Sequence, residues 1–385
     1  MGRSQREAHN PILSLPFPLA RKGGAYMSSL ALPSAREEAW RWSDLSALPG
    51  LCDAPPTGVA GEPHWIGDGP RLLFVDGKFD AGRSRPGPVR VGPTEAASDH
   101  PLARLATGSG WTLSLGVDAA TPPGAVEIVH IATGGASHLP ARIVMAEDAQ
   151  ASIVETYIGD GWANRLTLIE LGHAARLMRA IRIGQTSGFT SLRDEARLGQ
   201  GASLVTTVLG AGRGGSRIDA AIILDGPGAF AEHGGALLAR DSQRHEAAIV
   251  VRHAQPRGTS RQLWRAVADD RAVTSMAARV EVARDAQKTD GEQSLRGLML
   301  KRSATVNLKP ELEIFADDVK CAHGATVGEL DAQALFYMTS RGISPDRAKA
   351  LLTRAFIADA LARIGDEPVR EAFQAEAERW LEAQG

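Results

Sequence analysis

A near-regular repeat in the middle of the chain constrains its fold more than any other feature. From Val126 onward, short runs of β-branched and apolar residues recur, separated by turns built on Gly or Asp and followed by a small residue. Successive small residues lie 24, 27 and 27 positions apart. Repeats of this length are typical of solenoids, in which each unit buries its apolar face against its neighbours. The small residues are Ala151, Ala175, Ala202 and Ala229.

Side chains alternate within each run, as in "SIVETY" and "RIDAAIIL". One face of each strand can therefore point into a narrow interior lined by Ala, Val, Ile and Leu, while the other meets solvent or a second chain. Aromatic residues make up only 5% of the chain, which suits such an interior. The pattern predicts a mainly β protein built as a right-handed parallel β-helix. A β-sandwich with irregular loops is the alternative that the pattern leaves open.

Composition changes along the chain predict four segments. Residues 1–26 are rich in proline and basic residues and are expected to form a disordered tail, with Met27 as a possible true start. Residues 27–125 are expected to form an N-terminal helical and mixed segment. The β-solenoid core is predicted over 126–327, where the repeat lies. A C-terminal α-helical module is predicted over 328–385, because the hydrophobic period there becomes helical.

Capping signals place the predicted helices. Ser34 and Glu37 have the spacing of a capping box, which predicts a first helix that ends near Gly50. Ser344 and Pro345 form the start of a later helix, because serine caps the first turn and proline fits its first position. The apolar stripes of the three C-terminal helices are Leu330, Ala334, Leu335 and Met338, ending at Gly342; Leu352, Phe356, Ala360 and Ile364; and Val369, Phe373, Ala377 and Leu381, with Trp380 beside them.

Charge and cysteine content exclude several classes of protein. Lys and Arg number 43 against 45 Asp and Glu, giving a formal net charge of -2, so the sequence predicts no nucleic-acid partner and no acidic membrane surface. No apolar run is long enough to span a bilayer. Two distant cysteines do not form a disulfide framework, which favours a reducing, cytoplasmic location.

The candidate metal ligands are one cysteine and one histidine. Cys321 and His323 are two residues apart, so on a strand their side chains point the same way and can approach one ion. Two ligands are half a site, and Cys52 is remote in sequence. Either a second polypeptide completes the site, or Cys321 packs as a small hydrophobe beside a hydrogen-bonded histidine. His245 and His253 are interpreted as solvent-facing or interface residues of a strand.

One long stretch resembles a known family. "ELEIFADDVKCAHGATVGELD" followed by "LFYMTSRGI" lies within residues 286–343. This stretch resembles the SufB/SufD family of iron–sulfur cluster assembly proteins, and looser similarity covers most of the chain after Met27. Cys321, His323 and the following Gly324 are similar to the SufD members of the family, whereas SufB members usually have an acidic residue after that histidine.

The resemblance implies a function without catalysis by this chain. It implies a scaffold subunit that pairs with SufB and receives the ATPase SufC on its C-terminal helices, where Leu352 and Phe356 are the expected docking residues. It also implies that Cys321 and His323 lie at the SufB interface as ligands of iron or of a transient iron–sulfur cluster. No permanent cofactor is expected. The isolated chain could form a homodimer.

Two other function classes remain open from the residues. Solenoids also occur in carbohydrate-active enzymes such as polysaccharide lyases and in acyltransferases, and fold alone does not decide function. An enzyme of that kind would need a groove of paired acids and bases along one face, and the sequence does not identify one. A homodimeric structural solenoid is the third reading. Co-purification with an ABC-type ATPase would distinguish the first reading from both others.

Overall fold

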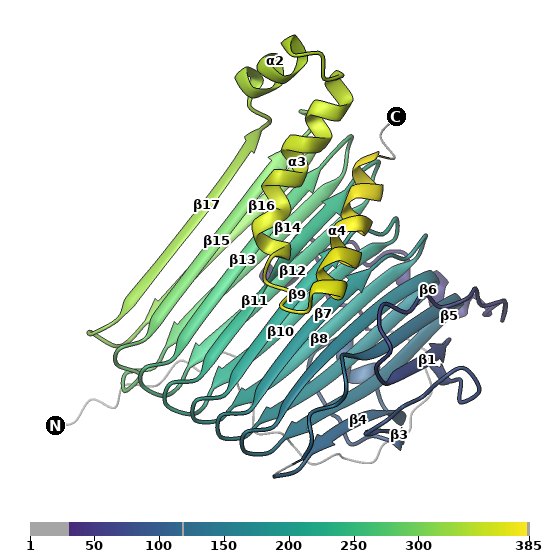
Figure 1. Cartoon of the computed structure of the whole chain (residues 1–385), viewed down its shortest axis with the longest axis vertical. Coiled ribbons are helices and arrows are strands. Elements are labelled where there is room, and N and C mark those ends of the chain that lie inside the picture. The colour runs from purple at the N-terminus through teal and green to yellow at the C-terminus, as the bar shows by residue number, and fades with distance from the viewer. Residues whose placement is uncertain (1–30, 118, 383–385) are drawn as a thin grey trace.

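The structure is a computed structural model that describes residues 31–117 and 119–382. Its described part is a parallel β-solenoid with helices on both outer faces (Figure 1). Each turn contributes one strand to each of two facing sheets. The prediction of a parallel β-solenoid core is therefore confirmed. The expectations for residues 1–26 and for Met27 lie outside the described residues.

Two sheets run the length of the solenoid, and the long strands β5 and β6 cross from one sheet into the other. The first sheet contains β1 (Arg71–Val75), β5 (Val126–Met145), β6 (Gln150–Leu171), β7 (Arg176–Ile183), β9 (Ser203–Gly210), β11 (Phe230–Ala239), β13 (Thr259–Ala268), β15 (Asp290–Met299) and β17 (Lys320–Glu329). The second contains β4 (Ser109–Leu115), β5, β6, β8 (Phe189–Leu198), β10 (Gly215–Leu224), β12 (Arg244–His253), β14 (Val273–Val282) and β16 (Thr305–Ile314). At its start, β2 (Lys78–Phe79) and β3 (Val89–Pro93) pair antiparallel with β1 and β4.

The strand register corrects the first interval of the predicted repeat. Gln150 pairs with Arg176, so the residue stacked on Ala175 is Ala149 and not Ala151. The interval is thus 175 − 149 = 26 residues, close to the next two. Ala149 and Ala151 both follow the same turn, so the sequence alone does not show which of them stacks on Ala175. The stacked alanines before β6, β7, β9 and β11 are Ala149, Ala175, Ala202 and Ala229, all buried.

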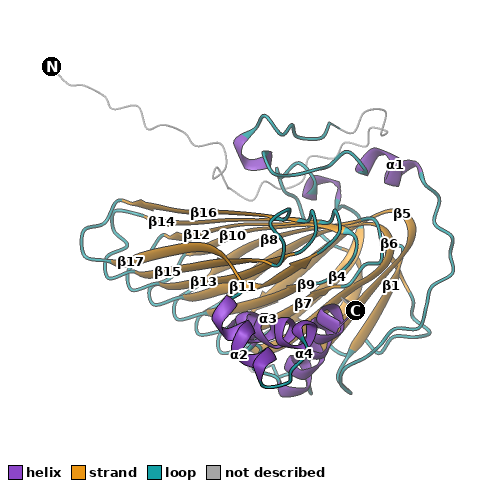
Figure 2. Cartoon of the chain, turned by 90° about the horizontal axis from the view of Figure 1, so that it is seen from above, coloured by secondary structure: helices purple, strands orange, loops and turns teal. Residues whose placement is uncertain are grey.

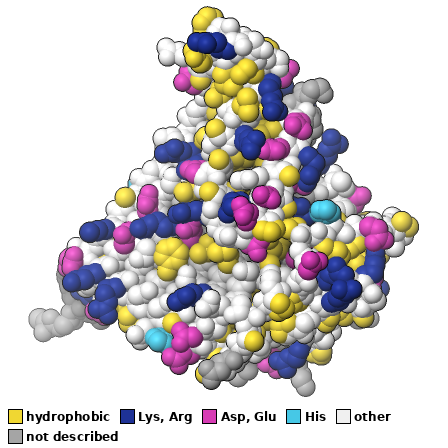
Figure 3. All heavy atoms as spheres, in the orientation of Figure 1, with side chains coloured by type: hydrophobic (Ala, Val, Ile, Leu, Met, Phe, Trp, Pro, Cys, Tyr) yellow, Lys and Arg dark blue, Asp and Glu magenta, His cyan; other side chains and the backbone are white. Residues whose placement is uncertain are grey.

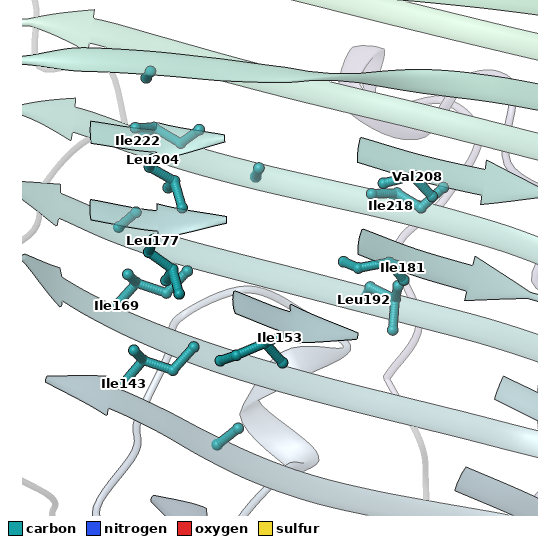
Figure 4. Close-up of a cluster of buried hydrophobic side chains, with 14 of the residues drawn as sticks. Ile143, Ile153, Ile169, Leu177, Ile181, Leu192, Leu204, Val208, Ile218 and Ile222 are labelled. Atoms are coloured by element: carbon teal, nitrogen blue, oxygen red, sulfur yellow. The ribbon is translucent and has the colours of Figure 1, made fainter. Parts of the chain in front are cut away.

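The space between the two sheets is filled mainly by small and branched apolar side chains, as the alternation predicts. Figure 4 shows residues of both sheets meeting in this interior. Burial of each such side chain contributes about 1.5–3 kcal/mol relative to exposure. The labelled members are Ile143, Ile153, Ile169, Leu177, Ile181, Leu192, Leu204, Val208, Ile218 and Ile222.

Glycines make the corner at which β6 passes between the sheets. Gly161 has φ +117° and Gly188, stacked one turn on, has φ +83°. A β-carbon on Gly188 would lie 2.1 Å from the Gly161 carbonyl oxygen. Only a residue without a side chain permits both this backbone conformation and this approach. The corner therefore depends on these glycines.

The C-terminal helices are α2 (Ala332–Ser340), α3 (Pro345–Leu361) and α4 (Glu367–Glu382). Figure 2 shows α3 and α4 lying against the first sheet. Ile357 and Phe373 pack on the outward side chains of that sheet, including Leu209 and Leu238, in one hydrophobic cluster. These two helices thus share a core with the solenoid.

Most helix signals in this region are confirmed. Ser344 and Pro345 begin α3, although the Ser344 hydroxyl makes no capping hydrogen bond. Gly342 ends α2 with φ +87°, and the Ile343 amide donates to the Met338 carbonyl, as in a Schellman motif. The predicted stripe of α4 is buried: Val369, Phe373, Ala377 and Leu381, with Trp380.

The predicted stripe of α3 is partly wrong. Ala360 and Ile364 are buried, but Leu352 and Phe356 are only half-buried, and Thr353 and Ile357 take the contact with the sheet. Position around a helix is set by the surface on which the helix packs, and the sequence does not contain that surface.

The N-terminal helix predicted from Ser34 to Gly50 is also wrong. The Ser34 amide does donate to the Glu37 carboxylate, but the Ser34 hydroxyl accepts from the Arg36 amide instead of that of Glu37, and only a 3₁₀ turn, η1 (Glu38–Trp40), follows. The chain then turns, because the Asp44 carboxylate accepts hydrogen bonds from the backbone and hydroxyl of Ser46, which compete with helix formation. The remaining short elements are α1 (Leu48–Asp53), which contains Gly50, and η2 (Ala103–Leu105).

These N-terminal segments cover the second sheet. Trp40 and Leu48 pack with Leu102 against Trp162 and Phe189 of the sheet. Figure 2 shows them on the face opposite α3 and α4. The N-terminal segments and the C-terminal helices therefore each cover part of one outer face of the solenoid. The last strand, β17, is left exposed to solvent.

Candidate functional site

The candidate site lies at the C-terminal end of the solenoid, where the stack of strands ends. Within the described residues, β17 pairs only with β15, and β16 only with β14. Figure 1 shows β17 as the outermost strand. Every residue of β17 except Cys321 is exposed. A strand with an unpaired edge can add a strand from another chain.

The interior surface of the solenoid continues onto this exposed strand. Cys321 stacks on Gly291, His323 on Gln293 and Val327 on Gly297, and these residues of β15 are all buried. Val327 is nevertheless 44% exposed. The last turn therefore presents to solvent a surface that every earlier turn buries. Repeat proteins need a cap or a partner on such a surface.

Cys321 is half-buried and faces inward. A β-carbon on Gly291 would lie 3.4 Å from its Sγ, so the thiol sits directly over that glycine. Burial raises the pKa of the Cys321 thiol, and Asp290 adds to this effect, although a hydrogen bond from the Gly291 backbone opposes it. The thiol is therefore protonated at neutral pH, and the thiolate is the form that binds metals.

His323 lies two residues further along the same inward row and is exposed. The structure thus brings Cys321 and His323 to one side of β17, as the sequence predicts. No group of three or more His, Cys, Asp or Glu residues within residues 31–117 and 119–382 could hold a metal ion. Cys52 belongs to α1, which contacts β5 and β6 at the opposite end of the stack. The described residues therefore form no complete metal site around this pair.

His245 and His253 are buried, so their interpretation as solvent-facing residues is wrong. They are 1% and 0% exposed and point into the interior from β12. His245 shares a 2.7 Å hydrogen bond with Ser216, and His253 shares one of 2.8 Å with Ser260. Burial lowers the pKa of each to about 4, so both rings are neutral at physiological pH. His245 links β12 to the stacked strand β10 of the same sheet, and His253 links β12 to β13 of the facing sheet, so both serve packing and neither belongs to a metal site among the described residues.

Sequence reasoning missed a cluster of charges inside the solenoid. Arg179 is 2% exposed and lies 2.6 Å from Glu155 and 2.5 Å from Asp194, which projects from the facing sheet. Tyr157 donates a 2.8 Å hydrogen bond to the second oxygen of Glu155. The signal was present in "SIVETY", where Glu155 falls on the same face as two apolar neighbours, Ile153 and Tyr157. The interior is thus not purely aliphatic.

The expected docking residues lie on α3. Leu352 and Phe356 are half-buried, and Phe356 partly contacts the core beneath α3. All nine residues of α2 are at least partly exposed, with Phe336 at 75% and Tyr337 at 60%. Figure 3 shows hydrophobic side chains gathered at this end of the molecule. Exposed aromatic side chains of this kind are enriched at protein interfaces.

A family description, "SUF system FeS cluster assembly, SufBD core domain", matches residues 130–356. The match covers the solenoid together with α2 and most of α3. The chain belongs to the SufBD family. This membership agrees with the parallel solenoid and identifies the protein as one of iron–sulfur cluster assembly.

Curated relatives support the SufD-like character of this SufBD protein. It is 24% identical to the iron–sulfur cluster assembly protein SufD of Escherichia coli, over 88% of this chain and 87% of that protein. It is 27% identical to a SufBD family protein of Mycobacterium leprae, over 92% of both chains. A shorter match, 40% identical over 32% of this chain and 26% of the relative, joins it to ABCI7, a chloroplastic protein of Arabidopsis thaliana. No described helix is long and apolar enough to cross a membrane.

Proposed function

We propose that the chain is a non-catalytic scaffold subunit of cytoplasmic iron–sulfur cluster assembly, which pairs with SufB and carries the ATPase SufC. The exposed last turn is the observation that supports pairing most directly. Its edge strand β17 has free backbone groups and an inward row that lacks a covering layer. A partner that adds a strand alongside β17 would pair with these backbone groups and help to cover the inward row, as in other cases of strand addition. Pro310 on β16 lacks an N–H, so β17 is the better edge for pairing.

The cluster is the cargo of this scaffold. Cys321 and His323 supply one soft and one nitrogen ligand from this chain, and SufB supplies the others. A site divided between two subunits is weak in each half, which suits a cluster that must later leave. A homodimer through β17 is the form expected of the chain when SufB is absent. A carbohydrate-active solenoid enzyme has less support, because Glu155 and Asp194 are enclosed in the interior and do not line a groove. A purely structural homodimer would use the same exposed edge but would leave the pair Cys321 and His323 without a role.

Changing Val327 to Asp should abolish pairing with SufB, because a charge then replaces an apolar side chain of the inward row. Val59→Asp is the matched control, since Val59 is an even more exposed valine, at 84%, in the N-terminal segment. Co-expression of each variant with SufB, followed by affinity capture, measures the effect. Equal recovery of SufB by both variants would show that the last turn is not the interface.

Docking of SufC is proposed on the helices that follow β17. Leu352→Asp and Phe356→Asp should each abolish co-purification of SufC, because each removes a half-buried apolar group of α3 whose exposed part is available to a partner. Phe356 also touches the core, so the circular dichroism spectrum of each variant must remain that of a folded solenoid. Phe336→Asp on α2 tests the fully exposed aromatic neighbour. Retention of SufC by all three variants would place its docking surface elsewhere.

A further inference from the structure

A column of polar side chains runs through the solenoid interior and ends at His323. Strand register stacks one member on the next from β7 to β17, across five strand spacings or about 24 Å. Between β11 and β13, Glu232 pairs with Arg261, so the next residue of each strand, His233 and Gln262, also stack on each other. The column consists of Arg179, Thr206, His233, Gln262, Gln293 and His323.

The two glutamines of the column make the same contact with the facing sheet. Gln262 donates its amide N–H to the Arg279 carbonyl at 3.0 Å, and Gln293 donates to the Glu311 carbonyl at 3.3 Å. Each side chain is 1% exposed. Each amide is therefore held through its nitrogen, which fixes the orientation of the carbonyl end.

The Oε1 atom of Gln293 is buried and, like that of Gln262, has no hydrogen-bond partner among the described residues, His323 included. A buried acceptor without a partner is energetically costly, so such atoms need an explanation. On one side of Gln293 in the column lies Gln262, whose amide already donates to Arg279. On the other side lies His323, whose ring carries a donor.

We propose that Gln293 is a positioning residue for His323: the exposed ring, which the structure shows without a hydrogen bond to Gln293 Oε1, turns on β17 so that its N–H donates to that atom. This bond selects one tautomer and leaves the other ring nitrogen bare and directed away from the solenoid. Histidines that bind metals are commonly held in this way by a second group. The use of the bare nitrogen as an iron ligand rests on the proposed function, whereas the hydrogen bond does not.

The tautomer of His323 tests the bond directly. In the full chain labelled with ¹⁵N-histidine, two-bond ¹H–¹⁵N spectra at about pH 8, where an imidazole is neutral, report which nitrogen is protonated. The His323 signals are those lost in His323→Ala. Wild type should show one dominant tautomer, and Gln293→Met should shift the ratio about fivefold, as expected for one hydrogen bond.

Gln262→Met is the matched control, because it removes the same amide one strand deeper and should leave the His323 ratio unchanged. An unchanged ratio in Gln293→Met, or an equal shift in Gln262→Met, would overturn the proposal. In the complex with SufB, Gln293→Met should also weaken iron binding by about tenfold or more. If the tautomer ratio shifts in Gln293→Met but His323→Ala leaves enzyme maturation intact, the hydrogen bond stands and the proposed function fails. If the ratio does not shift but His323→Ala abolishes maturation, only the positioning role of Gln293 is rejected.

Discussion

Replacing His323 with alanine should abolish maturation of iron–sulfur enzymes in cells that have no other assembly pathway. The change removes an imidazole from an exposed strand and deletes no backbone hydrogen bond, so the chain should still fold and assemble with its partners. The loss would therefore come from the missing nitrogen ligand. Activity of an iron–sulfur reporter enzyme in such a strain measures the effect, and recovery of the intact complex is its internal control.

Cys321→Ser provides the graded comparison. It nearly keeps the size of the side chain over Gly291 but replaces a soft sulfur ligand with a hard oxygen, which binds iron less well. Maturation should fall but need not vanish, because a half-buried cysteine can also serve in packing. Normal maturation in His323→Ala would show that this pair of residues is structural.

Replacing Arg179 with methionine should destabilise the solenoid by about 3–5 kcal/mol, because Glu155 and Asp194 would then be buried charges without their shared partner. Attraction to the two carboxylates raises the pKa of the Arg179 guanidinium despite its burial, so the arginine is charged throughout the range in which the protein is studied. Denaturant unfolding of the full chain gives the magnitude.

The matched variant removes all three charges together. Arg179→Met combined with Glu155→Gln and Asp194→Asn leaves hydrogen-bonding amides in place of uncompensated carboxylates, so it should recover a large part of the lost stability. This outcome would assign the cost to unpaired charge and not to the altered volume. A single Arg179→Met variant within about 1 kcal/mol of wild type would contradict the ion cluster.

The sequence predicts the solenoid well because each turn is specified locally. Alternation puts apolar side chains on one face, and a small residue after a Gly or Asp turn allows the next layer to stack. The same local rules also place Cys321 and His323 on one side of a strand. The structure alone shows that this side of β17 continues the solenoid interior. That conclusion depends on the register between β17 and the buried residues of β15, which lie 30 positions earlier in the chain.

Long-range packing explains what the sequence does not predict. Ser34 and Glu37 have capping-box spacing and form one of its two hydrogen bonds, yet the segment does not continue as a helix and places Trp40 and Leu48 on the second sheet. His245 and His253 look like solvent-facing strand residues, but the facing sheet covers them. The exposed side of α3 likewise depends on which of its sides meets the solenoid. In each case the deciding contact lies far away in the chain.

We propose that this chain holds half of a cluster site and that SufB holds the rest. Anaerobic co-expression with SufB and SufC, followed by native mass measurement with iron and sulfide analysis, tests this division of the site. We expect a complex that contains all three proteins and binds a cluster in a His323-dependent way, while the isolated chain binds little iron. An isolated chain that binds a full cluster by itself, or a complex that forms and binds its cluster unchanged with His323→Ala, would contradict it.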